Sequence, residues 1–286
     1  MEADPLFHVK QLFYQAAYKA CIAEASSQSL TPSESSSEPL LRSLYIARSH
    51  LALSPPATSS ALSTLKPFDA PSAKAVSALA EYLAKSDSSH VDAVRDLVIE
   101  CEGGEESQDE GVVRVIAGTI FILEGENEEA VATLTEGAGK TDLECNALLV
   151  QLLLSLNRRD LALSTYNAAK RIGNDSLLVQ AMEAWIGLKA GARPLHQSYY
   201  FYEELYQLPN GRTPAVVASH AASHLLLGHL EEAKADIQNL EDASPEVLAV
   251  AKTLGLAATL TNHPFALDLE SKSAAFDSAA ANFIPA

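Results

Sequence analysis

The fold is decided by residues 118–134, which read Gly118-Thr-Ile-Phe-Ile-Leu-Glu-Gly-Glu-Asn-Glu-Glu-Ala-Val-Ala-Thr-Leu134. Gly118 and Phe121 end one apolar segment, Gly125 supplies a turn, and Ala130 lies near the start of a second segment. A Gly or Ala where two helices cross lets their axes approach to about 8–10 Å, and larger residues fill the adjoining space. The stretch therefore predicts two helices packed as a hairpin.

The same order of small, turn, acidic and small residues returns in later segments of the chain. The residues predicted to pack within or between hairpins are small or form turns, namely Gly118, Ala130, Ala162, Ser198, Gly228 and Ala233. Their second-helix members are spaced close to the about 34 residues of one tetratricopeptide hairpin. Weaker matches to the repeat at Ala93 and Ala20 extend the pattern toward the N-terminus. The repeat predicts an all-α fold, a right-handed superhelix of tetratricopeptide-like helical hairpins.

Breaks between the hairpins do not separate unrelated domains. A Ser/Pro/Glu-rich segment near residues 26–38 and an acidic, Gly-containing segment near residues 102–111 are expected to be loops. A last pair of helices, near residues 245–260 and 263–281, is expected to cap the array. We therefore expect one solenoid over residues 1–286.

Composition excludes several classes of function. The 286 residues are 48% hydrophobic with one Trp, which favours helices, and the formal net charge is −17. Such a charge repels nucleic acids and anionic membrane surfaces. The longest apolar stretches, residues 112–123 and 147–156, are shorter than the roughly 18–20 residues that cross a bilayer. We expect no nucleic-acid partner and no insertion into a membrane.

The cysteines and the N-terminal segment indicate the compartment. Cys21, Cys101 and Cys145 are odd in number, far apart and without a C-x-x-C pair, which fits reducing conditions. Residues 1–8 carry early acids where a signal peptide carries basic residues. The sequence predicts a cytosolic protein that begins at Met1.

Candidate chemistry is sparse. His220 and His224 have the spacing of a zinc-binding pair and His229 follows, but the repeat register places them at packing positions and no Glu stands at position 221. The acids of residues 102–110 have the character of a solvated loop, and the aromatic residues of 199–206 are interrupted by acids, which favours packing over base stacking. We expect no enzyme activity, no metal, no cofactor and no small-molecule substrate.

The repeat register also predicts a binding groove on the first helix of each hairpin. The residues predicted to line it are mostly apolar, namely Val115, Thr119, Ile122, Leu148, Gln151, Met182, Trp185, Leu188, Ser219, Ala222 and Leu226. A groove for a charged peptide terminus would carry Lys, Arg and Asn, so a chaperone-tail adaptor is disfavoured. An open apolar groove favours aggregation, which indicates that a partner fills it permanently. The alternative, a register error that makes these residues core, stays open.

Five segments together resemble the coatomer epsilon subunit family. They are Asp4–Tyr14, Leu143–Ala162, Tyr199–Leu205, Gly228–Ala233 and His263–Phe265. The resemblance runs along the whole chain, and the segment Leu143–Ala162 is the most specific because its order goes beyond the generic repeat. The two predicted loops depart from the family's pattern, which leaves their contacts in doubt.

The resemblance implies a structural subunit of the coat of vesicles that move from the Golgi to the endoplasmic reticulum and within the Golgi. It implies a cytoplasmic protein, peripheral on Golgi membranes and coated vesicles, whose hairpins curl around the C-terminal region of the coatomer alpha subunit. The alternative function is a tetratricopeptide adaptor or co-chaperone that binds a peptide segment of another protein.

Overall fold

The computed structural model describes residues 4–27, 38–102, 109–238, 247, 250–251 and 264–283. Within these ranges the chain is built from helices and contains no strand. It divides into two compact units, residues 1–190 and 191–286. The all-α prediction is confirmed, whereas a single solenoid over the whole chain stays a prediction.

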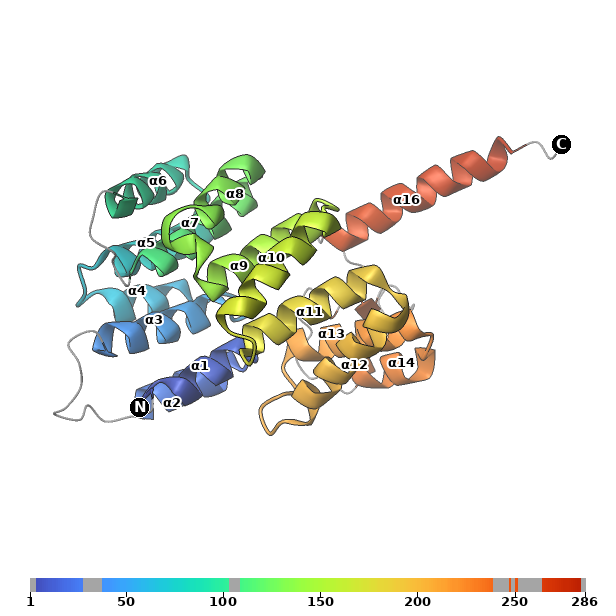
Figure 1. The fold of residues 1–286 in the computed structure, drawn as a ribbon, viewed down its shortest axis with the longest axis horizontal. Coiled ribbons are helices and arrows are strands. Elements are labelled where there is room, and N and C mark those ends of the chain that lie inside the picture. Colours follow the sequence, from blue (N-terminus) through green and yellow to red (C-terminus); the bar gives the residue numbers. More distant parts are fainter. Residues whose placement is uncertain are drawn as a thin grey trace. The chain divides into compact units, whose positions relative to one another are not determined.

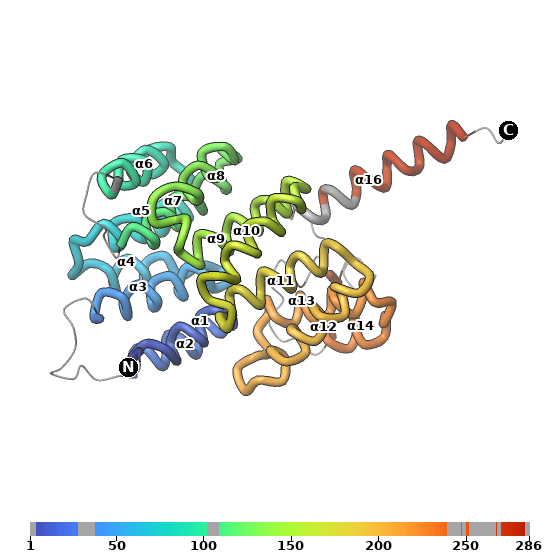
Figure 2. Tube along the Cα trace, in the orientation of Figure 1, coloured from blue at the N-terminus to red at the C-terminus, as the bar shows by residue number. Residues whose placement is uncertain are grey.

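In the first unit the helices from α1 to α10 follow one another in pairs that pack together (Figures 1 and 2). The first unit contains α1 (Phe7–Tyr14), α2 (Tyr18–Ser27), α3 (Glu38–Leu51), α4 (Thr58–Leu65), α5 (Pro71–Ala84), α6 (Ser88–Glu102), α7 (Glu110–Glu124), α8 (Asn127–Thr135), the short 3₁₀ helix η1 (Gly137–Lys140), α9 (Leu143–Ser155), α10 (Arg159–Ile172) and α11 (Leu177–Ala190). The second unit contains α12 (Ala192–Gln207), α13 (Pro214–Leu227), α14 (Leu230–Gln238) and α16 (Pro264–Ala281).

Neighbouring hairpins of the first unit pack through their odd-numbered helices. The helix α3 contacts α5, α5 contacts α7, α7 contacts α9, and α9 contacts α11. The helix α1 also contacts α11, so this row of helices turns back on itself within the first unit. A stack in which each hairpin touches its neighbours is the arrangement that the repeat predicted.

The α7–α8 hairpin forms as its residues predict. Gly125 ends α7 in the left-handed region at φ 82°, which a side chain opposes. Ala130 is fully buried where α8 crosses α7, and a Cβ on Gly118 would lie 2.9 Å from Leu134 Cδ2. The close crossing therefore depends on a missing side chain at position 118.

A buried ion pair fixes the same hairpin to η1. Arg114 donates from Nε to Glu110 Oε1 over 2.7 Å and from Nη1 to the Thr133 carbonyl over 2.9 Å. Glu110 Oε1 also accepts from the Ala138 N–H over 3.0 Å. Every member of the group has a partner, which offsets the cost of burying charge inside an apolar stack.

The α13–α14 hairpin repeats the pattern in the second unit. Pro214 opens α13, the Thr213 side chain accepts from the Val216 N–H, and Gly228 ends the helix at φ 84°. Ala221 and Ala233 are fully buried. The sequence pattern thus locates this hairpin correctly.

Three details of the predicted repeat need correction. Gly228 is an exposed turn residue and has no packing role, because a Cβ there would meet nothing within 4 Å. On α6 Ala93 is exposed and the adjacent Val94 is fully buried, so the predicted packing position is wrong by one residue. The sequence pattern did not predict the small residue Ala61, which is fully buried in α4.

The predicted loops and cap fall partly outside the described residues. Residues 28–37, 103–108 and most of 239–263 belong to that part of the chain. The helix α16 matches the second predicted capping helix in extent. The described side chains of this helix, at positions 267 and 270–281, are exposed, and the cap stays a prediction.

Candidate interaction surface

The candidate surface is carried by the first helix of each predicted hairpin. We call the outward-facing residues of α7, α9 and α11 the first-helix face, which lies within residues 1–190. The second unit carries α13 in the same hairpin position.

The predicted groove residues divide by burial. Those that are half-buried or exposed are Thr119, Ile122, Leu148, Gln151, Trp185 and Leu188 on the first-helix face, and Ser219, Ala222 and Leu226 on α13. Gln151 is exposed on α9, and Leu226 is 55% exposed on α13. These nine residues remain candidates for contact with a partner.

Two predicted groove residues lie in the core. Met182 is fully buried and Val115 is 8% exposed, and both belong to the cluster that joins α7, α9 and α11. The helix α7 packs on α5, α6, α8 and α9, and α11 packs on α9, α10 and α1, so more of each helix is buried than a single apolar stripe indicates. We therefore remove Val115 and Met182 from the candidate surface.

A polar contact joins α1 and α3, at the start of the odd-numbered row, to α9 near its end. Glu144, at the start of α9, accepts from the Tyr14 hydroxyl over 2.7 Å and from the Arg48 guanidinium. Tyr14 lies at the end of α1 and Arg48 in the last turn of α3. The Arg48 guanidinium also lies over the Phe13 ring, 4.8 Å from its centroid. This contact, which we call the Glu144 clasp, ties α1 and α3 to α9.

Burial and charge set the protonation states in the Glu144 clasp. Burial opposes ionisation of Glu144, but the charge and hydrogen bond of Arg48 prevail and hold the pKa of the Glu144 carboxyl below its usual value. Burial, followed by the charge of Glu144, raises the pKa of the Tyr14 hydroxyl. Tyr14 therefore stays a hydrogen-bond donor and Glu144 an acceptor at neutral pH.

The comparisons with known proteins identify the family. A family model described as "Coatomer epsilon subunit" matches residues 2–250. The chain belongs to the coatomer epsilon subunit family. It is therefore a component of a vesicle coat, as the sequence resemblance implied.

Curated relatives of the coatomer epsilon family agree over most of their length. Coatomer subunit epsilon-1 of Arabidopsis thaliana is 27% identical over 251 residues, which cover 86% of this chain and 81% of the relative. Coatomer subunit epsilon of Caenorhabditis elegans is 25% identical over 301 residues, covering 98% of this chain and 99% of the relative. Coatomer subunit epsilon of Dictyostelium discoideum is also 25% identical, over 257 residues, covering 86% and 81%.

A solved structure shows the fold independently of the family. A tetratricopeptide repeat protein from Parabacteroides merdae superposes with a TM-score of 0.51 at 11% identity, covering 84% of this chain and 86% of that one. The tetratricopeptide-like architecture is confirmed. None of the helices in the described part of this coatomer epsilon chain is long and apolar enough to cross a bilayer.

Sequence reasoning assigned no role to the members of the Glu144 clasp. Tyr14 and Glu144 lie in two of the segments that carry the resemblance, but they are 130 residues apart. The repeat register shows which helix face a residue occupies and does not show that the row returns to its start. That return depends on the summed rotation of several hairpins.

The histidines of α13 are buried, as the repeat register predicted. His220 is 3% and His224 7% exposed. The sequence did not predict that Glu203 of α12 and Asp236 of α14 would both contact His220. Both acids lie on other helices, 17 and 16 residues away in the sequence, so no helical spacing links them to His220.

Proposed function

We propose that this chain is a non-catalytic scaffold subunit that binds and stabilises the C-terminal region of the coatomer alpha subunit. It acts on the cytoplasmic side, peripheral on Golgi membranes and coated vesicles, in transport from the Golgi to the endoplasmic reticulum and within the Golgi. The observation that carries the proposal is the family match over residues 2–250. Because coat subunits work as an assembly, a protein partner is the ligand class to expect.

The composition of the first-helix face supports a protein segment as its ligand. Ile122, Leu148, Trp185 and Leu188 are apolar and incompletely buried. Residues of this kind gain about 25 cal/mol for each Å² of apolar surface that a partner covers. A partner segment with apolar side chains suits this face better than a charged peptide terminus, which needs Lys and Arg.

The Glu144 clasp supports a preformed face. It joins α1 and α3 to α9 by hydrogen bonds of a buried carboxylate, which hold the odd-numbered row in one arrangement. A face that is already ordered loses less conformational entropy when a partner binds. The same contact explains why residues of the first hairpins matter for a surface carried by α7, α9 and α11.

The test is a titration of the purified chain with a C-terminal fragment of the coatomer alpha subunit, followed by size-exclusion chromatography with light scattering. We expect a one-to-one complex and a lone chain that is less stable or aggregates. Gln151→Arg places a charge on the first-helix face and is expected to weaken binding at least about tenfold, because an unpaired charge in an interface is costly.

The matched control lies on the opposite side of the same hairpin. Leu163 is on α10 and 47% exposed, so Leu163→Arg adds the same charge away from the first-helix face. Equal weakening by both variants would show that the face is not the site. A monodisperse lone chain that ignores the fragment would overturn the partner assignment.

A further inference from the structure

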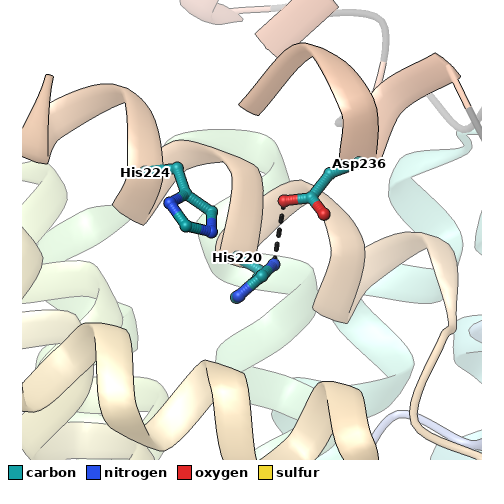
Figure 3. A group of neighbouring side chains, drawn as sticks. All are labelled: His220, His224 and Asp236. Carbon is teal, nitrogen blue, oxygen red and sulfur yellow. Dashed lines mark hydrogen bonds and ion pairs between the residues drawn. The ribbon is translucent and has the colours of Figure 1, made fainter. Parts of the chain in front are cut away.

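The α12–α14 region of the second unit holds a cluster of metal-ligating side chains that the coat function does not use. His220 and His224 lie one turn apart on α13, and Asp236 reaches them from α14 (Figure 3). His220 and His224 are buried, the Asp236 side chain is 11% exposed, and one ligand atom from each lies within 4.8 Å of the other two. Two imidazoles and a carboxylate are a common ligand set for zinc.

The distances are near those of a metal site. His220 Nδ1 is 2.8 Å from Asp236 Oδ2. Ligand atoms around a tetrahedral zinc ion, at Zn–N of about 2.0–2.1 Å, stand about 3.3 Å apart. The ligand atom of His224 lies within 4.8 Å of the other two, so it has to move closer to complete the set.

His220 has a carboxylate at each of its two ring nitrogens. Its Nε2 lies 2.7 Å from Glu203 Oε2, so a carboxylate faces each ring nitrogen. A neutral imidazole carries one N–H, and one of the two carboxylates then faces a lone pair. A second proton, on the ring or on a carboxyl group, satisfies this contact, and so does a metal ion bound to both His220 Nδ1 and Asp236.

Glu203 fits the role of an outer partner. Metal-binding histidines usually donate the N–H of the other ring nitrogen to a carboxylate, which orients the ring and fixes the tautomer. When His220 donates its Nε2–H to Glu203, the lone pair of its Nδ1 is directed at Asp236. The rings of Tyr199 and Tyr206 stack on the imidazole and restrict its rotation.

The charges around the two imidazoles suit metal binding. Burial and the neighbouring His220 lower the pKa of His224, so its ring is neutral and has a free lone pair at pH 7. For His220, burial is outweighed by the hydrogen bonds to Asp236 and Glu203, which raise its pKa. The titratable and charged groups that face the two rings are Tyr199, Glu203 and Tyr206 from α12, His229 from the turn after α13, and Glu232 and Asp236 from α14.

We propose that His220, His224 and Asp236 form a site for a divalent transition-metal ion such as Zn²⁺, with Glu203 holding His220 in the ligating tautomer. The fourth position is open to water or to His229, whose Nδ1 is 3.3 Å from His224 Nδ1. The ion would link α13 to α14, and through Glu203 to α12. Its role is structural, and it is independent of the proposed partner.

Competition with a proton gives the site a distinctive signature. The ion has to displace a proton from His220 Nδ1, so binding releases protons and tightens as the pH rises. With one proton released, affinity is expected to rise up to about tenfold for each pH unit below the pKa of the protonated ring. Mg²⁺ and Ca²⁺ prefer oxygen ligands and are expected not to compete.

The test uses the full chain, treated with a chelator, dialysed, and titrated with zinc sulfate by isothermal calorimetry at pH 7.5 and pH 6. We expect one saturable Zn²⁺ per chain at pH 7.5, weaker binding at pH 6, and proton release that depends on the buffer. His224→Gln and Asp236→Asn are expected to lose at least about a hundredfold in affinity.

Controls separate ligand loss from misfolding. His196 is exposed on α12 of the same unit, so His196→Gln removes an imidazole outside the cluster and is expected to leave binding unchanged. Circular dichroism shows whether each variant keeps its helices. The visible absorption of bound Co²⁺ reports on tetrahedral nitrogen ligands in the unaltered chain. Absence of one-to-one binding, or unchanged binding by a folded His224→Gln variant, would overturn the proposal.

Discussion

Small side chains at helix crossings control the packing of each hairpin at the scale of single residues. Ala130 is fully buried on α8, whereas Ala132 on the same helix is exposed. We expect Ala130→Leu to destabilise the chain by about 1–3 kcal/mol, because the added isopropyl group has no space at the crossing. Urea denaturation measures the change, and Ala132→Leu is the matched control, expected within about 0.5 kcal/mol of the unaltered chain.

The Glu144 clasp predicts a dependence of stability on pH. Glu144→Gln leaves Arg48 buried without an anionic partner, which costs about 3–5 kcal/mol at neutral pH. The pKa of Glu144 is lowered from 4.5 in the folded chain. The stabilisation is therefore complete above pH 4.5 and is lost as the pH falls through the lower folded value.

Urea denaturation of both proteins from pH 7 down to acidic pH tests this dependence. The free-energy difference between the unaltered chain and Glu144→Gln is expected to shrink at low pH. Glu100→Gln, an exposed acid on α6, is the control and is expected to show a small, constant difference. A difference for Glu144→Gln that stays constant with pH would contradict the assigned role.

The role of a single residue could be predicted where it depends on nearby sequence, and not where it depends on distant parts of the fold. The burial of Ala162 and Ala233 was predicted because a small residue at this position of a hairpin usually lies at the helix crossing. Arg114 is a charged residue inside the apolar stretch 112–123, and its side chain is 1% exposed and paired with Glu110. Its burial follows from the position of η1 beyond the hairpin, which repeat spacing does not encode.

At the scale of elements, two glycines determine where the first helices end. Gly125 ends α7 and Gly228 ends α13, both at positive φ, and a Cβ at either site would meet no atom within 4 Å. We expect Gly125→Ala and Gly228→Ala each to destabilise the chain by about 1–2 kcal/mol through backbone strain alone.

Asn substitutions distinguish strain from crowding. Asn adopts the left-handed conformation more readily than Ala, so Gly125→Asn and Gly228→Asn are expected to cost less than the Ala variants in the same denaturation assay. If Asn, which is larger, were the more disruptive residue at both sites, crowding would be the cause and the strain argument would fail.

Helix positions were easier to predict than helix surroundings. The spacing of Gly125, Ala130, Gly228 and Ala233 located α7, α8, α13 and α14, because turn and crossing residues are local signals. The burial of Met182 was not predicted, since it depends on which neighbouring hairpins cover α11. The same limit applies to Glu203 and Asp236, which reach His220 from two different helices.

At the scale of the whole chain, family membership followed from segments whose residue order goes beyond the repeat. Leu143–Ala162 is the clearest of these, and it contains Glu144. The return of α1 to α9 and α11 could not be predicted, because a small rotation at each hairpin accumulates along the row. The proposed binding face therefore combines helices that the sequence located with an arrangement that only the structure provides.

Hydrogen–deuterium exchange, measured with and without the C-terminal fragment of the coatomer alpha subunit, tests the central claim most directly. The account predicts slower exchange on binding in peptides from residues 110–124, 143–155 and 177–190, which form α7, α9 and α11. Peptides from residues 127–135 and 159–172, which form α8 and α10, are expected to exchange as before. Protection confined to α8 and α10, or no protection with the fragment in excess, would contradict the assignment of the first-helix face as the binding surface.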